Sequence, residues 1–225
     1  MSTAEVKERP IIFSDEMVRA ILDGRKTQAR VVIEPQLPEI ADTLRDIPGE
    51  NRWWCAIKVG FECGFFFENP GSDYQHDWKC PYGTFGDRLW VRENFYIDSF
   101  GAGVAQISYA ADGERGRACG VSDRKLPNRC GSVPSKNMPR HCSRINLEIT
   151  DVRIERVQDI REEDAIAEGV NGGCLECGHP DPCGCTNPSP DHRDGFIWLW
   201  DHINEKRGFG WESNPWVWVV EFEVV

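Results

Sequence analysis

Four cysteines within a short stretch of this 225-residue chain have the spacing of a metal-binding loop. Cys174 and Cys177 form a CxxC pair, Cys183 and Cys185 form a CxC pair, and His179 lies between the two pairs. Tetrahedral zinc takes four thiolate or imidazole ligands, and turn-forming glycines and prolines let a short loop wrap one ion. The spacing predicts a structural Zn²⁺ site made by the four cysteines, with His179 as the alternative ligand. A reduced loop without metal is the other interpretation.

A second set of candidate residues follows a short helix near the N-terminus. Ser14 is a suitable N-cap, apolar residues recur with helical spacing and a glycine follows, which predicts a helix over about residues 15–23. Lys26, Thr27 and Arg30 come directly after this helix. An ammonium that leaves water can become a base or a nucleophile, and a charged one binds phosphate. Lys26 is therefore a candidate catalytic residue, and Thr27 and Arg30 are candidate ligand-binding residues.

Glu168 is the candidate partner of these residues further along the chain. The pattern predicts a helix that begins at Asp159 or Ile160, includes Glu168 and ends at Gly169. A carboxylate in the last turn of a helix is disfavoured by the macrodipole, so this position indicates a role other than stability. We therefore treat Glu168 as a candidate for proton transfer, with an exposed glutamate of no special role as the alternative.

Aromatic and charged residues share one face of a strand expected between Leu89 and Phe95, where Trp90 and Arg92 alternate with apolar residues and Glu93 follows. An aromatic ring can stack on a base while a guanidinium binds its edge or its phosphate. These three residues are candidate ligand-binding residues, and a stabilising ion pair at the strand ends is the alternative. Further stacking candidates are Tyr82, Trp53 and Trp54.

The formal charge of −11 is unevenly distributed. From Arg161 onward there are 13 acidic and 4 basic residues, whereas the stretch from Asp112 to Arg144 has 3 acidic and 8 basic residues. Binding of nucleic acid by charge alone requires a basic surface, so the overall charge excludes a protein that coats nucleic acid electrostatically. The basic stretch predicts a loop in which Arg140 and Arg144 face phosphate, or else a solvated loop with no specific role.

Composition and pattern set the class of fold. A hydrophobic fraction of 40% excludes general disorder. The sequence contains no apolar run long enough to cross a membrane and no secretory leader, so we expect a cytoplasmic protein with no membrane contact and reduced cysteines. The six cysteines outside the cysteine-rich stretch are expected to be small buried side chains.

Expected strands at about 105–110, 145–149 and 216–224 and a helix over about 196–203 favour a mixed α+β barrel with peripheral helices.

Four ordered segments resemble the ASCH family of the PUA-like superfamily, particularly its longer bacteriophage and prophage members. The segments are RPIIFSDEMVRAILDGRKTQAR, CPYGTFGDRLWVREN, MPRHCSRINLEITDVRIERVQDIREEDAIAEGV and WLWDHINEKRGFGWESNPWVWVVEFEVV. The resemblance implies one PUA-like β-barrel domain over residues 1–225, with peripheral helices and the cysteine-rich insert at about 171–190.

The resemblance also implies a function. Family members are linked to binding of RNA or nucleosides, and some small ones look like amidohydrolases that act on acylated cytidine. Lys26 and Glu168 match the lysine and glutamate that such an amidohydrolase uses. Ala29 stands where it has a hydroxyl residue, and Val31 stands where the family pattern has arginine. A mechanism that needs this hydroxyl would have to take it from Thr27 or another residue.

The sequence therefore predicts that a bacteriophage accessory protein binds RNA, single-stranded nucleic acid, a nucleobase or a nucleoside in the cleft of the barrel. The first alternative is a hydrolase, either an amidohydrolase on a modified base or a nuclease, that uses Lys26 and Glu168. The second alternative is a phage protein that binds a host protein through the acidic C-terminal region. The oligomeric state is left open.

Overall fold

The structure is a computed structural model of the whole chain. It describes residues 6–37, 55–56, 64–68, 75–101, 104–116, 119–120, 127, 129–172 and 191–225. At residues 55–56, 64–68, 75–78 and 119–120 only the backbone is described. Neither Trp53 nor Trp54 belongs to the described residues.

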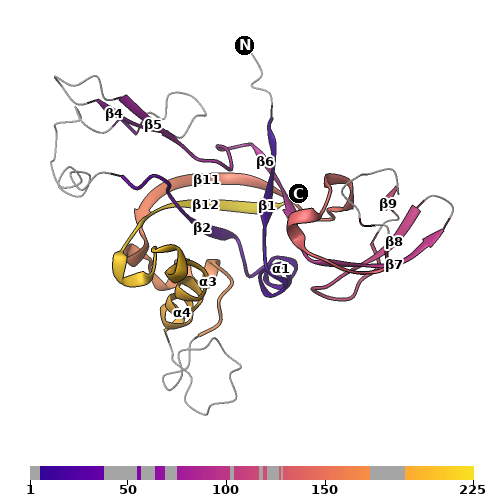
Figure 1. Cartoon of the computed structure of the whole chain (residues 1–225). Coiled ribbons are helices and arrows are strands. Elements are labelled where there is room, and N and C mark those ends of the chain that lie inside the picture. The colour runs from indigo at the N-terminus through magenta and orange to yellow at the C-terminus, as the bar shows by residue number, and fades with distance from the viewer. Residues whose placement is uncertain are drawn as a thin grey trace.

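Strands predominate over helices in the described part of the chain (Figure 1). The strands are β1 (Glu8–Ile12), β2 (Gln28–Val32), β3 (Cys55–Ala56), β4 (Gly64–Glu68), β5 (Gln75–Lys79), β6 (Arg88–Arg92), β7 (Phe95–Gly101), β8 (Val104–Tyr109), β9 (Cys119–Gly120), β10 (Gly131–Val133), β11 (Asn146–Arg156) and β12 (Trp216–Val224). The helices are α1 (Asp15–Leu22), α3 (Glu162–Ala167) and α4 (His192–Asn204). Short 3₁₀ turns are η1 (Ser135–Asn137), η2 (Arg140–Cys142), η3 (Val157–Asp159), η4 (Glu205–Arg207) and η5 (Trp211–Ser213).

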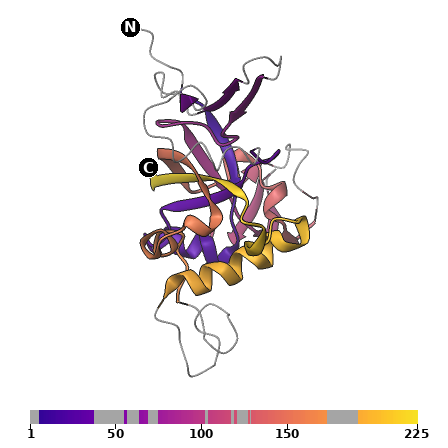
Figure 2. The same ribbon diagram turned by 90° about the vertical axis from the view of Figure 1, so that its left-hand side faces the viewer.

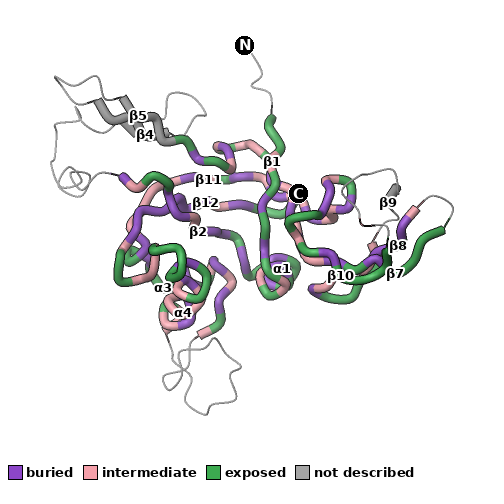
Figure 3. Tube along the Cα trace, in the orientation of Figure 1, coloured by how far each residue is buried: buried purple, intermediate pink, exposed green. Residues whose placement is uncertain are grey.

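The main sheet has the strand order β1-β6-β11-β12-β2, in which β1 is parallel to β6 and the other pairs are antiparallel. Strand β12 is buried on both faces because it lies between two neighbours in a sheet that is covered on both sides (Figure 3). Trp218 and Val220 belong to the largest core cluster, which includes residues of β1, α1 and β6. Val217 and Val219 belong to the cluster that includes residues of α3 and α4.

The helices lie near the positions that the sequence pattern predicts, but α3 begins at Glu162, not at Asp159 or Ile160, and Glu168 is its C-cap residue. Helix α1 begins after Ser14, whose hydroxyl accepts a hydrogen bond from the backbone N–H of Met17, and its inward face buries Val18 and Ile21. Helix α4 extends beyond the predicted 196–203 and buries Phe196 and Trp200. In a second view α4 lies along one side of the sheet (Figure 2).

A separate sheet, of order β10-β7-β8-β9, projects from the main body and has its own small core. This core contains Phe95, Ile97, Ile107 and Met138. The basic stretch was predicted to be a loop, but it includes β9, β10, η1 and η2. The third sheet has the order β3-β4-β5.

The prediction of a PUA-like β-barrel is wrong. The structure is a mixed α+β arrangement of open sheets, and among the described residues no pairing joins the edge strands β1 and β2 of the main sheet. Helix α1 connects these two strands, and both of them line one cavity. Alternating apolar residues predict strands and their buried faces, but closure depends on hydrogen bonds between edge strands, which no residue pattern encodes. The cysteine-rich insert that was predicted with the barrel lies outside the described residues.

Two further expectations are tested by the described residues. No described helix combines the length and the apolar character needed to cross a membrane. Cys80 is buried, as predicted, whereas Cys130 is exposed. Cys142 is buried but disulfide-bonded, so the prediction of a reduced thiol at this position is wrong.

Candidate functional site

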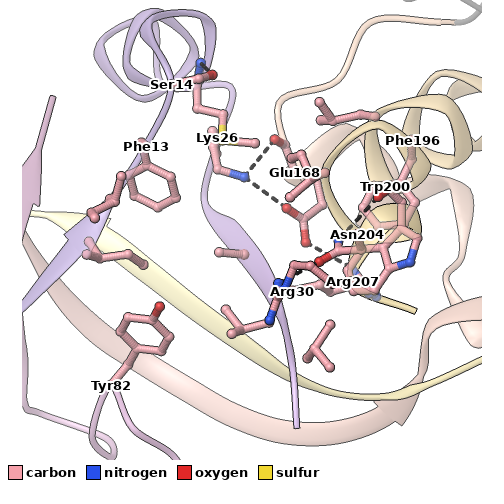
Figure 4. Close-up of a pocket in the computed structure, with 18 residues that line it drawn as sticks. Phe13, Ser14, Lys26, Arg30, Tyr82, Glu168, Phe196, Trp200, Asn204 and Arg207 are labelled. Carbon is pink, nitrogen blue, oxygen red and sulfur yellow. Dashed lines mark hydrogen bonds and ion pairs between the residues drawn. The ribbon is translucent and has the colours of Figure 1, made fainter. Parts of the chain in front are cut away.

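A cavity of about 350 Å³ lies between the β1–α1 junction, strand β2 and helix α4 (Figure 4). Small-molecule sites in proteins usually have volumes of about 300–1,000 Å³, so the cavity fits one small ligand. Its walls are largely apolar and aromatic, and the residues that form them are Ile11, Ile12, Phe13, Met17, Ala29, Val31, Val32, Tyr82, Phe196, Leu199, Trp200 and Ile203. The polar or charged lining residues are Ser14, Lys26, Arg30, Glu168, Asn204 and Arg207.

Lys26 is held by the junction between α1 and β2 against the end of α3. Its ammonium donates to the backbone oxygen of Gln28 at 2.8 Å, to the backbone oxygen of Glu168 at 2.9 Å and to the Glu168 carboxylate at 2.9 Å. An ammonium has three hydrogens, so these three acceptors use all of them. With only 2% of its surface exposed, Lys26 is a fully satisfied buried cation that also neutralises the C-terminal end of α3.

Glu168 is the C-cap residue of α3, and Gly169 follows it in the left-handed region with φ of 77°. Its carboxylate contacts two cations, since Oε2 accepts from Lys26 and Oε1 accepts from Nη1 of Arg30 at 3.3 Å. The backbone N–H of Thr27 donates to the Ala167 oxygen at 2.8 Å, which fixes the chain beside this pair. The structure therefore brings Glu168 into direct contact with Lys26 and Arg30, which lie far from it in the sequence.

A second layer of charge surrounds Arg30, whose side chain is fully buried. Its guanidinium also contacts Glu155 at 3.1 Å and Asp164 at 3.5 Å, and Arg153 binds these same two carboxylates. Burial alone would raise the pKa of Asp164, but the backbone N–H of Arg161 and the charges of Arg30 and Arg153 lower it below its ordinary value. These contacts hold Glu168 in one orientation at the cavity wall.

The cavity offers flat rings and one fixed acceptor group. Phe13, Phe196 and Tyr82 present aromatic surfaces, and each oxygen of the Glu168 carboxylate has capacity for a further hydrogen bond. Burial, followed by the effect of Cys80, raises the pKa of Tyr82, so its hydroxyl stays neutral and can donate. Ala29 lines the same cavity with a methyl group, which neither donates nor accepts.

Sequence reasoning missed the wall contributed by α4 and η4. The apolar spacing of Phe196 and Trp200 predicts a helix, but it does not indicate that this helix lines a cavity. Asn204 and Arg207 were not considered as site residues, although they follow the apolar stripe at helical spacing. Thr27, in contrast, was a candidate, but it is exposed and is not among the residues that line the cavity.

Three other candidates form a group away from the cavity lining. The ring of Trp90 lies 5.5 Å from the guanidinium carbon of Arg92 and 5.8 Å from that of Arg140, within the range of cation–π contacts. Arg140 also binds Glu8 at 3.1 Å and Asn146 at 2.8 Å. Trp90 and Arg92 alternate with the buried Leu89 and Val91, so their side chains are on the opposite face of β6 from the core.

Arg144 and Glu93 form an ion pair with each other and are not among the residues that line the cavity. Arg144 donates to both oxygens of Glu93, at 2.9 and 3.0 Å, and to Asp112 at 2.7 Å and Glu114 at 3.3 Å. Its guanidinium carbon lies 3.9 Å from the ring centroid of Tyr109. These contacts correspond to the stabilising ion pair that was the alternative interpretation of Glu93, and carboxylates already occupy Arg144.

The predicted zinc ligands Cys174, Cys177, Cys183 and Cys185, with His179 as the alternative, lie outside the described residues. Within the part of the chain that the structure describes, no group of three or more His, Cys, Asp or Glu side chains is arranged to hold a metal ion. The zinc site stays a prediction from the sequence. No protein-family model, curated protein or solved structure matches this chain.

Proposed function

We propose that the cavity binds a single nucleobase or nucleoside. The observation that carries this proposal is the position of the Glu168 carboxylate, fixed by two cations in the wall of a cavity with aromatic sides. A flat heterocycle can contact the aromatic rings while its amino group or ring N–H donates to the carboxylate, as carboxylates accept from the amino group of cytosine. The resemblance to nucleoside-binding ASCH proteins supports the same class of ligand.

The cavity favours a single base over a nucleic-acid strand. A strand needs a groove with cations free to contact successive phosphates. Here Lys26 and Arg30 are buried and engaged by carboxylates, and the formal charge of the chain is −11. A volume of about 350 Å³ is also at the lower end for small-molecule sites, about 300–1,000 Å³ in general.

Binding of nucleosides is best measured by titration calorimetry with the four ribonucleosides. We expect Glu168→Gln to weaken binding by about tenfold or more, because the amide removes one charged acceptor. Glu163→Gln is the matched control, since Glu163 is an exposed carboxylate on the same helix. Failure of every nucleoside and free base to bind the wild-type protein would refute the proposal.

A second pair of variants tests the cavity without disturbing the buried ions. Ile203 lines the cavity and is 46% exposed, whereas Ile166 is equally exposed but is not a lining residue. Ile203→Trp should obstruct the cavity and abolish binding, and Ile166→Trp should leave affinity unchanged. Equal affinity in both variants would place the ligand elsewhere.

Hydrolysis of a modified base is the second candidate function, because the residues matched to the amidohydrolase lysine and glutamate are in direct contact at the cavity wall. To act as a base or nucleophile, the Lys26 ammonium would have to give one proton to an acceptor and so give up one of its three hydrogen bonds. The hydroxyl absent at Ala29 would have to come from Ser14 or Tyr82, which line the same cavity. Incubation with acylated cytidine and with RNA, followed by chromatography, tests this candidate. Product formation that Lys26→Arg abolishes would favour the hydrolase over a binding protein.

A further inference from the structure

We propose that Arg207, at the mouth of the cavity, binds the phosphate of the ligand, so that the preferred ligand is a nucleoside monophosphate. This inference rests on the proposed function, because it assumes that the base occupies the interior of the same cavity. It adds a charged subsite to a pocket whose other cations, Lys26 and Arg30, are already engaged by carboxylates.

Exposure divides the cavity lining into an interior and a mouth. The side chains of Lys26, Arg30 and Glu168 are 1%, 0% and 6% exposed. Arg207 is 50% exposed, and Ile203, one helical turn before it, is 46% exposed. A ligand with its base against Glu168 would therefore direct its most polar group outward, toward the Arg207 side of the opening.

Arg207 is held in place while keeping an exchangeable contact. One guanidinium nitrogen donates to Oδ1 of the buried Asn204 at 2.9 Å, which anchors the side chain to α4. The other contacts Glu34, an exposed carboxylate that is not among the cavity-lining residues. Arg207 also acts electrostatically on Tyr82, another lining residue, which indicates that its charge reaches the cavity.

The contact with Glu34 is the one that a phosphate would replace. Glu34 is 56% exposed, and an ion pair between such exposed side chains is weak because water screens it. A phosphate monoester carries more negative charge than a carboxylate and matches the guanidinium with parallel hydrogen bonds. Asn204 would keep Arg207 in place as the ligand exchanges with Glu34.

The test compares ribonucleosides with their 5′-monophosphates by titration calorimetry, using the wild-type protein and three variants. Arg207→Gln removes the proposed phosphate contact, and Glu34→Gln removes its competitor. Arg193→Gln is the matched control, because Arg193 is also 50% exposed and paired with an aspartate but does not line the cavity.

We expect the monophosphate to bind the wild-type protein about tenfold tighter than the nucleoside. Arg207→Gln should remove this preference, because it weakens binding of the monophosphate more than binding of the nucleoside, and Glu34→Gln should increase the preference. Arg193→Gln should keep it. Tight binding of a 5′-phosphorylated trinucleotide would assign the same subsite to the terminal nucleotide of a strand, and binding of the monophosphate alone would assign it to free nucleotides.

Two outcomes would overturn the inference, and they are distinguishable from failure of the proposed function. Equal affinity for nucleoside and monophosphate, or a preference that persists in Arg207→Gln, would exclude the phosphate subsite while the nucleoside site stands. If neither ligand binds, the proposed function fails and the inference fails with it. If all the variants bind inorganic phosphate with equal affinity, the anion binds at a site other than Arg207.

Discussion

Two clusters of buried ion pairs in this protein use the same residue types but differ in what lies beside them. Around Lys26, the Glu168 carboxylate shares its oxygens between two cations and borders a cavity. Around Arg144, the Glu93 carboxylate is 0% exposed and gives both oxygens to one guanidinium. Each oxygen of both carboxylates accepts one of these hydrogen bonds, so the comparison teaches that a buried charge becomes a candidate ligand-binding group only where open volume adjoins it.

The largest expected loss of stability follows replacement of the Lys26 cation. Lys26→Met removes the ammonium that donates to the buried backbone oxygens of Gln28 and Glu168, and with it one of the two cations at the Glu168 carboxylate. Loss of one member of a buried pair generally costs about 3–5 kcal/mol, so we expect a decrease of this size in the unfolding free energy measured with urea. A decrease below about 1 kcal/mol would contradict the view of Lys26 as a fully engaged buried cation.

Replacement of Arg144 in the other cluster should cause a smaller loss of stability that depends on pH. Burial raises the pKa of Glu93 above its ordinary value even beside Arg144. Because the folded-state pKa exceeds the unfolded one, the contribution of Glu93 to stability falls as pH rises from about 4.3 through the raised value. Arg144→Met raises that pKa further, so it should cost about 2–3 kcal/mol near neutral pH and less at about pH 5. A loss independent of pH in urea titrations would exclude protonation of Glu93.

Two glycines, one in each cluster, differ in how closely other atoms approach their Cα atoms. Gly169 has φ of 77°, and a Cβ built on it would lie 2.8 Å from the Cβ atoms of Ala20 and Lys26. Gly113, between two carboxylates that bind Arg144, has φ of 74° with open space around it. Gly169→Ala should therefore cost about 2–3 kcal/mol and displace Lys26, whereas Gly113→Ala should cost only about 1 kcal/mol. Equal midpoints in thermal unfolding would contradict the close approach at Gly169.

The smallest expected effects are at the margins of the two clusters. Glu155 is 16% exposed and contacts Arg30 and Arg153, whereas Glu114 is 74% exposed at the edge of the Arg144 cluster. Glu155→Gln should cost about 1–2 kcal/mol, because it weakens buried charge-assisted hydrogen bonds. Glu114→Gln should change stability by less than about 0.5 kcal/mol, because water screens its charge. Similar losses in the two variants would remove the distinction between the clusters.

Local sequence patterns predicted much of the secondary structure. Helix α1 begins at the predicted N-cap Ser14, and the alternating residues of Trp216–Val224 form β12. Strand β2 was missed because Gln28 and Arg30 read as polar loop residues, although both are buried beneath α3 and α4. A buried polar residue looks the same in sequence as an exposed one, since only its partners on distant elements make burial favourable.

For the candidate site too, local patterns identified residues but did not show which of them are in contact. Lys26 and Glu168 were singled out from a helix stop and a helix end, and the resemblance to a known family named the same two residues as a catalytic pair. Their contact at 2.9 Å is a fact of the tertiary structure, and whether they bind or catalyse stays a prediction. Trp90, Arg92 and Arg140 carried equally good local signals but form a separate group. Strand β6 directs Trp90 and Arg92 away from the core face, and Arg140 of η2 contacts the Trp90 ring there.

The sequence by itself determined where helix α1 begins and which faces of several strands are apolar, because capping and side-chain periodicity act over a few residues. Only the tertiary structure decided that, among the described residues, no pairing closes the main sheet between β1 and β2, that Arg30 joins the Lys26–Glu168 pair, and that α4 completes a cavity. The physical reason is that edge pairing, buried ion pairs and enclosed volume depend on elements brought together from more than 100 residues apart, as with Arg30 and Glu168, which are separated by 138 positions.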